Sequence, residues 1–152
     1  MTSSGRNTLL RAAIAAVRDC ADTMEIQAAS LLQALSELAM NEGLRATALG
    51  LSAGLRDASG RVMFELALLQ TEIGEGETDI AAAVQRLSAM DATMMTAVAA
   101  MTDVVDELEK AAERDSAQER AFVLVIEATG VMLQGIEKAK AATEALGAGV
   151  PI

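Results

Sequence analysis

The sequence predicts an all-α protein, an up-down-up-down antiparallel bundle of four helices, each about 30–35 residues long. Three observations predict it. Ala, Leu, Met, Glu and Gln dominate the chain, and these side chains lose little rotamer freedom in a helix. The only proline is Pro151, so no helix is interrupted by that residue type. Apolar residues recur in alternating steps of three and four, which is the spacing of one helix face.

The first helix is expected over residues 7–41. Asn7 or Thr8 can serve as its N-cap, and the stretch 41–43, ending in Gly43, resembles a helix end. Its apolar positions form an unbroken seam of the kind found in coiled coils. They are Leu10, Ile14, Val17, Ala21, Met24, Ala28, Leu31, Leu35 and Leu38.

The second helix, expected over residues 44–73, has a less regular apolar face. Gly50, Gly54 and Gly60 each cost about 1 kcal/mol in a helix relative to alanine. One interpretation therefore breaks the segment into two helices near Gly60. The other keeps it continuous, with the small residues permitting a close helix crossing. We expect continuity, because the segment then matches the length of the other helices.

The third helix is expected over residues 79–113. The stretch 74–77 is Gly-Glu-Gly-Glu, the clearest loop in the chain, and Thr78 or Asp79 is placed to cap the helix that follows. Its apolar face again alternates in steps of three and four. The face comprises Ile80, Ala83, Leu87, Met90, Met94, Ala97, Met101, Val104, Leu108 and Ala111.

The fourth helix is expected over residues 117–146. Ser116 and Glu119 have the spacing of a capping box, and Gly147 and Gly149 end the helix. Its expected core face is Phe122, Val125, Thr129, Met132, Ile136, Ala139, Thr143 and Leu146.

The four helices are expected to form a single domain over residues 1–152, because the connections between them are short and place consecutive helices side by side. An alternative is a dimer in which two chains exchange helical hairpins. The same four helices would form it, and short connections favour such swapping.

Charge and cysteine content argue against several classes of partner. The formal net charge is −10, so a phosphate backbone or an anionic membrane would be repelled, and we expect no nucleic-acid partner. The longest uncharged stretches, 26–36 and 92–102, are far shorter than the ~20 residues that span a bilayer, so no transmembrane segment is expected. The single cysteine, Cys20, suits a reducing compartment, and we expect a cytoplasmic protein.

The residue inventory also argues against an enzyme. The chain contains no histidine, which removes the usual general base at neutral pH and the commonest metal ligand. No glycine-rich phosphate loop is present, and the serine and cysteine side chains have no histidine to activate them. We therefore expect no catalytic residues and no cofactor.

One feature that could bind a ligand is sulfur. Cys20 and Met24 are four residues apart, as are Met90 and Met94, so each pair shares a helix face. Threading the bundle brings both pairs towards one end, together with Met63 and Met132. A thiolate among thioethers is a soft site that would favour Cu(I), and a loosely packed Met/Ala core would hold a small apolar ligand. The competing interpretation, which we prefer, is that methionine fills a core that lacks aromatic residues.

Acidic residues are the other feature with possible chemistry. Asp91 lies beside the Met90–Met94 seam, and if buried it needs a partner, for which Arg18 and Arg61 are the candidates. A second group of acidic residues clusters at the C-terminal end of the third helix, where negative charge is unfavourable to the helix dipole. A basic partner surface, a divalent cation or solvation by water would each stabilise these carboxylates. It comprises Asp103, Asp106, Glu107, Glu109, Glu113 and Asp115, with Glu42 at the same level.

Gly130 and Gly135 in the fourth helix indicate close packing or the close approach of a ligand.

The function expected from these features is non-enzymatic. Over half of the residues are hydrophobic (52%), so we expect a single bundle to leave some Leu, Val and Met exposed beyond its seams. A partner surface would cover the remainder, so the first expectation is protein–protein interaction, as a homo-oligomer, a scaffold or a regulatory partner. The alternative is a binding module that holds Cu(I) or a small apolar ligand near Cys20, Met24, Met90 and Met94. A third possibility is adhesion to a lipid or polymer surface after the helices open.

Overall fold

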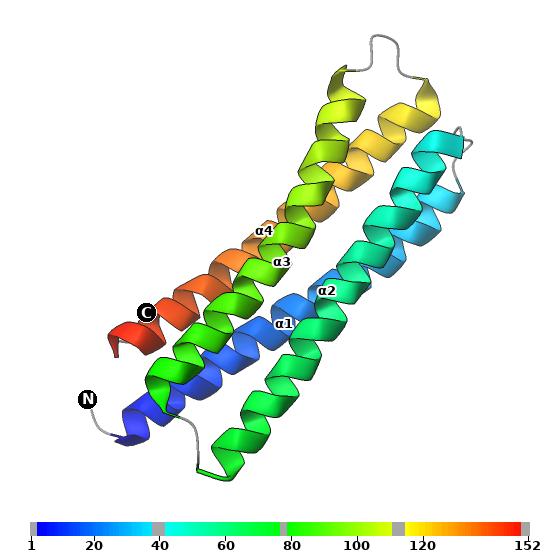
Figure 1. Cartoon of the computed structure of the whole chain (residues 1–152). Coiled ribbons are helices and arrows are strands. Elements are labelled where there is room, and N and C mark those ends of the chain that lie inside the picture. The colour runs from blue at the N-terminus through cyan, green and yellow to red at the C-terminus, as the bar shows by residue number, and fades with distance from the viewer. Residues whose placement is uncertain (1–2, 38–41, 77–78, 111–114, 150–152) are drawn as a thin grey trace.

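The computed structural model describes residues 3–37, 42–76, 79–110 and 115–149, and these residues form four long helices. Successive helices lie side by side and run in opposite directions along an elongated bundle (Figure 1). No strand occurs in the described ranges. The all-α four-helix bundle expected from the sequence is confirmed. The helices are α1 (Ser3–Ser36), α2 (Glu42–Gly74), α3 (Ile80–Lys110) and α4 (Ser116–Ala148).

The four helices share one apolar core. α1 packs on α2 and on α4 and also touches α3 across the bundle, whereas α2 and α3 make the least extensive contact of the neighbouring pairs. The described seam residues of α1 are all buried, as the heptad pattern predicts. Among the described helices, none contains a stretch long and apolar enough to cross a lipid bilayer.

In the first half of α4 the core-facing positions differ from the expected face at two places, and near its end Ala142 and Ala145 are buried in addition. Ala121 and Ala128 are buried, while Phe122 and Thr129 are only partly buried. Seven residues do not complete two full turns of a straight α-helix, so a strict seven-residue pattern rotates around the helix by about 20° per heptad. The residues that face the core therefore change along the helix.

The bounds of α1 differ from those expected. The helix begins at Ser3 rather than at residue 7, so Asn7 and Thr8 lie inside its first turns and do not cap it. It ends at Ser36, whose hydroxyl donates to the carbonyl of Gln33 at 2.8 Å and so satisfies one acceptor of the last turn. Gly43 lies within α2 and does not end α1. Residues 38–41 and 111–113, the expected ends of the first and third helices, lie outside the described residues.

The expectation that residues 44–73 form one continuous helix is confirmed by α2. The three glycines do not explain its packing, because a methyl group added at Gly50, Gly54 or Gly60 would have no neighbour within 4 Å. Two buried serines make the close crossing instead. Ser52 and Ser59 donate to the carbonyls of Ala28 and Ala21 on α1, at 3.0 Å and 2.7 Å. The two bonds set the register of α2 on α1.

Three helix ends show how side chains satisfy backbone groups. Asp79 accepts from the N–H of Ala82 at 2.7 Å, as expected for a cap of α3. The capping box of α4 lies one residue earlier than expected, at Asp115 and Gln118 rather than Ser116 and Glu119. Gly149, with φ +69°, ends α4 in the left-handed conformation that glycine adopts freely, whereas Gly147 is still helical.

Candidate functional site

The four sulfur residues proposed as ligands all lie in the core. Cys20 and Met24 are buried on α1, and Met90 and Met94 are buried on α3. Met132 of α4 is also fully buried, whereas Met63 of α2 packs at the edge of the core.

Contacts between helices show how these sulfur atoms are spread along the bundle. Cys20 Sγ faces Gly135 of α4, where an added methyl group would lie only 3.3 Å from the sulfur. Met24 and Met132 each lie about one turn from this contact, towards the same end of the bundle. Asp91, which follows Met90, contacts Thr143 about two turns from Gly135 in the opposite direction. The sulfur atoms therefore occupy several successive layers of the core.

The environment of Cys20 opposes the thiolate form that binds metal ions. Burial, together with the smaller effect of the negative charge of Asp91, raises the pKa of its thiol from 9.0 to about 11. In the described part of the chain, no three Cys, Asp or Glu side chains are grouped closely enough to hold a metal ion. Ligation by the thioethers is not tested by these observations, and the Cu(I) site stays a prediction.

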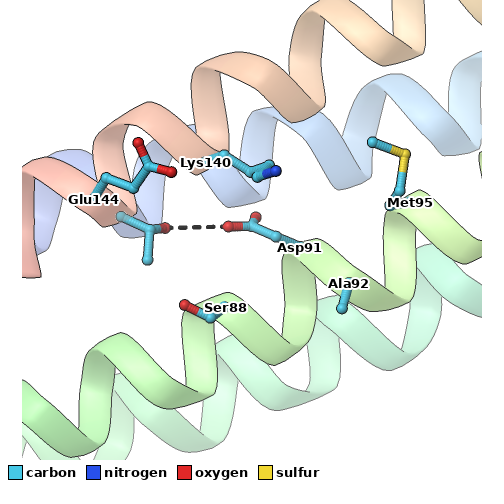
Figure 2. A pocket seen from close by; sticks show the side chains of 7 residues that line it. Ser88, Asp91, Ala92, Met95, Lys140 and Glu144 are labelled. Carbon is cyan, nitrogen blue, oxygen red and sulfur yellow. Dashed lines mark hydrogen bonds between the residues drawn. The ribbon is translucent and has the colours of Figure 1, made fainter.

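Asp91 is the one charged side chain that is buried among the described residues, with 5% of its surface exposed. Its carboxylate points from α3 towards Thr143 of α4, whose hydroxyl lies 3.3 Å from Oδ2 (Figure 2). The expectation that an arginine partners it is wrong for Arg61, which pairs with Asp57 on its own helix at 2.6 Å. The cation that acts on Asp91 is Lys140 of α4, and no bond from Arg18 to Asp91 is found.

The hydrogen bonding of Asp91 is incomplete. The Thr143 hydroxyl has a single proton, and the carbonyl of Ala139 is the closer acceptor, at 2.9 Å. Asp91 Oδ1 is buried without any hydrogen-bond partner. Burial is the main cause that raises the pKa of Asp91 from 3.8 to about 6; the Thr143 bond and Lys140 lower it, and Glu144 raises it.

Asp91 lines a pocket between α3 and α4 with a volume of about 300 Å³. Asp91 and Thr143 are its buried residues, and the other lining residues are exposed at its rim (Figure 2). The rim carries one positive and one negative side chain beside apolar and hydroxyl groups. It is formed by Ser88, Ala92 and Met95 of α3 and by Lys140 and Glu144 of α4.

Sequence reasoning singled out Asp91 but not this pocket. Asp91 follows directly after a seam residue, which was the available signal. Lys140 and Glu144 read as ordinary surface charges of a helix, and Thr143 as one position of a core face. Only the pairing of α3 with α4 brings the three side chains to Asp91.

The acidic group at the end of α3 is largely solvated. Asp103, Asp106, Glu107 and Glu109 are exposed, so water stabilises their charges. Asp115 has a separate role, because its side chain caps α4. Glu113 and the side chain of Glu42 lie outside what the structure describes.

A second hollow, of about 350 Å³, lies on the outer side of α2 and α3. Phe64, one of the two aromatic residues of the chain, lines it with 64% of its surface exposed. Arg86 of α3 forms ion pairs with Glu65 and Glu72 of α2 beside the hollow. We call the surface formed by Arg61, Phe64, Glu65, Leu68, Glu72 and Arg86 the Phe64 face.

No protein-family model, curated protein or solved structure matches this chain.

Proposed function

We propose that this protein acts through protein–protein contact and that it self-associates through the Phe64 face. The observation that carries the proposal is the exposure of Phe64 beside a hollow, whereas no aromatic side chain is among the fully buried core residues that the structure describes. An aromatic side chain surrounded by polar groups is the usual centre of a protein interface. Leu68, one turn further along α2, extends the apolar surface and is also exposed.

The charges of the Phe64 face favour a second copy of the chain as the partner. In a two-fold dimer the same surface contacts itself, so it must carry groups that complement one another. Arg61 of α2 and Arg86 of α3 supply positive charge, and Glu65 and Glu72 of α2 supply negative charge. Two copies can exchange these pairs around a central pair of phenylalanines. The acidic end of α3 has no such balance and would repel itself.

The test compares Phe64→Glu with Ile26→Glu in sedimentation velocity at a series of protein concentrations. Ile26 is a matched control, since 63% of its surface is exposed on α1, away from the Phe64 face. Wild type and Ile26→Glu should form the same oligomer, and Phe64→Glu should remain monomeric. A wild type that stays monomeric at high micromolar concentration, or a Phe64→Glu variant that associates normally, would sink the proposal.

The second candidate function is a binding module for Cu(I) or a small apolar ligand. Its support is the dry environment of Cys20, Met24, Met90 and Met94, all of which are buried. The cost of ionising the Cys20 thiol weighs against the copper form. Native mass spectrometry of protein purified without chelator is the direct test. Extra mass that disappears in Cys20→Ala or Met94→Leu would support this function, and a clean apo mass would remove it.

The composition bears on the cellular location of the protein and on its class of partner. A single cysteine and no disulfide favour the cytoplasm. The net charge of −10 disfavours nucleic acid as a partner.

A further inference from the structure

We propose that the pocket between α3 and α4 binds a small organic ammonium ion. Its N–H groups pair with the buried carboxylate of Asp91, and its short apolar part lies against Ala92 and Met95. This site is separate from the Phe64 face, so it does not depend on self-association.

The need for a donor follows from the hydrogen bonding of Asp91. Oδ1 has no partner, and Oδ2 shares the single proton of Thr143 with a closer carbonyl. A buried carboxylate normally accepts two or more hydrogen bonds, and an unsatisfied one is costly. A bound ammonium group supplies up to three N–H donors and a compensating charge.

The charges around the pocket select a cation. Asp91 and Glu144 contribute two negative charges and Lys140 contributes one positive charge, which leaves the pocket one negative charge in excess. An anion would meet Asp91 directly. A single-charged cation neutralises the site, and Glu144 at the rim attracts it as it approaches.

The donor set favours an organic ammonium ion over a metal ion. Divalent metal ions need several oxygen ligands, whereas only Asp91 and Glu144 offer carboxylates here. No cluster of three potential Asp, Glu or Cys ligands exists among the residues described. An ammonium ion needs only directional acceptors, which Asp91 and the hydroxyl of Ser88 supply.

The size of the pocket limits the ligand. A volume of about 300 Å³ is at the lower end for ligand sites, and it holds roughly ten heavy atoms if each takes the ~30 Å³ share of a water molecule. The exposed thioether of Met95 and the methyl group of Ala92 offer an apolar wall to a short chain. Lys140 and Ser88 line the same pocket as the carboxylate, and both side chains can change rotamer without moving the backbone.

The test uses n-butylammonium chloride as the probe and n-butanol as its neutral counterpart, titrated into ¹⁵N-labelled full-length protein at pH 7.5. Butylammonium should produce saturable shifts in the amide signals of Ser88, Ala92 and Thr143, with a dissociation constant on the order of 1 mM for so small a ligand. Butanol should bind about tenfold or more weakly, because it lacks the charge that pairs with Asp91.

Two variants with the same change of charge separate the site from general electrostatics. Asp91→Asn should weaken butylammonium binding about tenfold or more, while Asp57→Asn, on the exposed side of α2, should leave it unchanged. Circular dichroism verifies that both variants are folded. Equal binding of butylammonium and butanol, equal effects of the two variants, or no saturable shift in wild type would each overturn the proposal.

The pH dependence provides an independent readout. Asp91 faces Lys140, Thr143 and Glu144 of α4, Ser88 of its own helix and the Cys20 thiol of α1. The pKa of Asp91 is raised to about 6, so its charge changes in this pH region. Butylammonium affinity should fall as the pH is lowered from 7.5 to about 5, and an affinity that stays constant over this interval would contradict the assignment.

Discussion

At the scale of single residues, the burial of Asp91 makes the stability of the protein depend on pH. A carboxyl group whose pKa in the folded protein exceeds its ordinary value favours folding only while it is protonated. The pKa of Asp91 is raised from 3.8 to about 6, so its contribution is fully present below pH 3.8 and is lost as the pH rises through 6. At neutral pH the buried charge therefore destabilises the protein.

Asp91→Asn removes this charge and should stabilise the protein at pH 7.5 but not near pH 4. The pKa of Asp91 is 3.8 ordinarily and about 6 in the folded protein. This shift means that the free energy of unfolding of Asp91→Asn, relative to wild type, should increase by about 2–3 kcal/mol between pH 4 and pH 7.5. Urea denaturation followed by circular dichroism at both pH values measures it. A stability difference that is the same at pH 4 and pH 7.5 would show that Asp91 does not titrate in this way.

Two glycines of α4 differ only in what lies beside them. Alanine is favoured over glycine in a helix by about 1 kcal/mol, and a methyl group at Gly130 would meet nothing within 4 Å. A methyl group at Gly135 would meet Cys20 Sγ at 3.3 Å. Gly130→Ala should therefore raise the free energy of unfolding by about 0.5–1 kcal/mol. Gly135→Ala should raise it by clearly less, or lower it.

The role of Cys20 in this difference is checked by a double-mutant cycle. With the sulfur removed in a Cys20→Ala background, Gly135→Ala should recover the gain seen at Gly130. If Gly135→Ala behaves the same in both backgrounds, the sulfur is not the obstacle. Thermal unfolding of the four proteins of the cycle is sufficient to decide.

At the scale of the helices, the start of α4 gives a direct test of the observed capping box. The side chain of Asp115 accepts from the N–H of Gln118 at 2.8 Å, and the Gln118 side chain accepts from the N–H of Asp115 at 3.1 Å. Asp115→Ala should cost about 1 kcal/mol in unfolding free energy, as for other N-cap residues. Ser116→Ala, one residue further on, should cost almost nothing. The reverse ranking would place the cap at Ser116, where the sequence pattern put it.

The helices also show the limits of reading small residues from a sequence. The glycines of α2 were expected to allow a close crossing, but the close contact with α1 is made by Ser52 and Ser59. The spacing of small residues in the sequence does not distinguish the serines from the glycines, because both residue types are small and both recur along the helix. What separates them is the direction in which each faces, and that depends on where α1 lies.

At the scale of the whole molecule, the net charge of −10 acts against self-association. Two copies repel each other over distances comparable to the Debye length, which falls from about 10 Å at 0.1 M salt to about 3 Å at 1 M. The centre of the contact proposed at the Phe64 face, made by Phe64 and Leu68, is apolar, and its burial does not weaken with salt.

Self-association should therefore become tighter as salt increases over this range. Analytical ultracentrifugation at about 0.1 M and 1 M sodium chloride measures the change. A weaker association at high salt would mean that the ion pairs of Arg61 and Arg86 dominate the contact, in place of Phe64.

The sequence by itself determined the helical class of this protein, the number of helices and most of the buried residues of α1. These properties follow from local preference and from the three-and-four spacing of apolar side chains, both of which are present within each segment. Asp91 was recognisable as a residue that would need a partner if it were buried. The tertiary structure alone decided that the partner is Thr143, that Cys20 faces Gly135, and that a pocket opens beside Lys140. These contacts join helices far apart in the chain, and their register depends on how side chains pack between helices, which no single segment records.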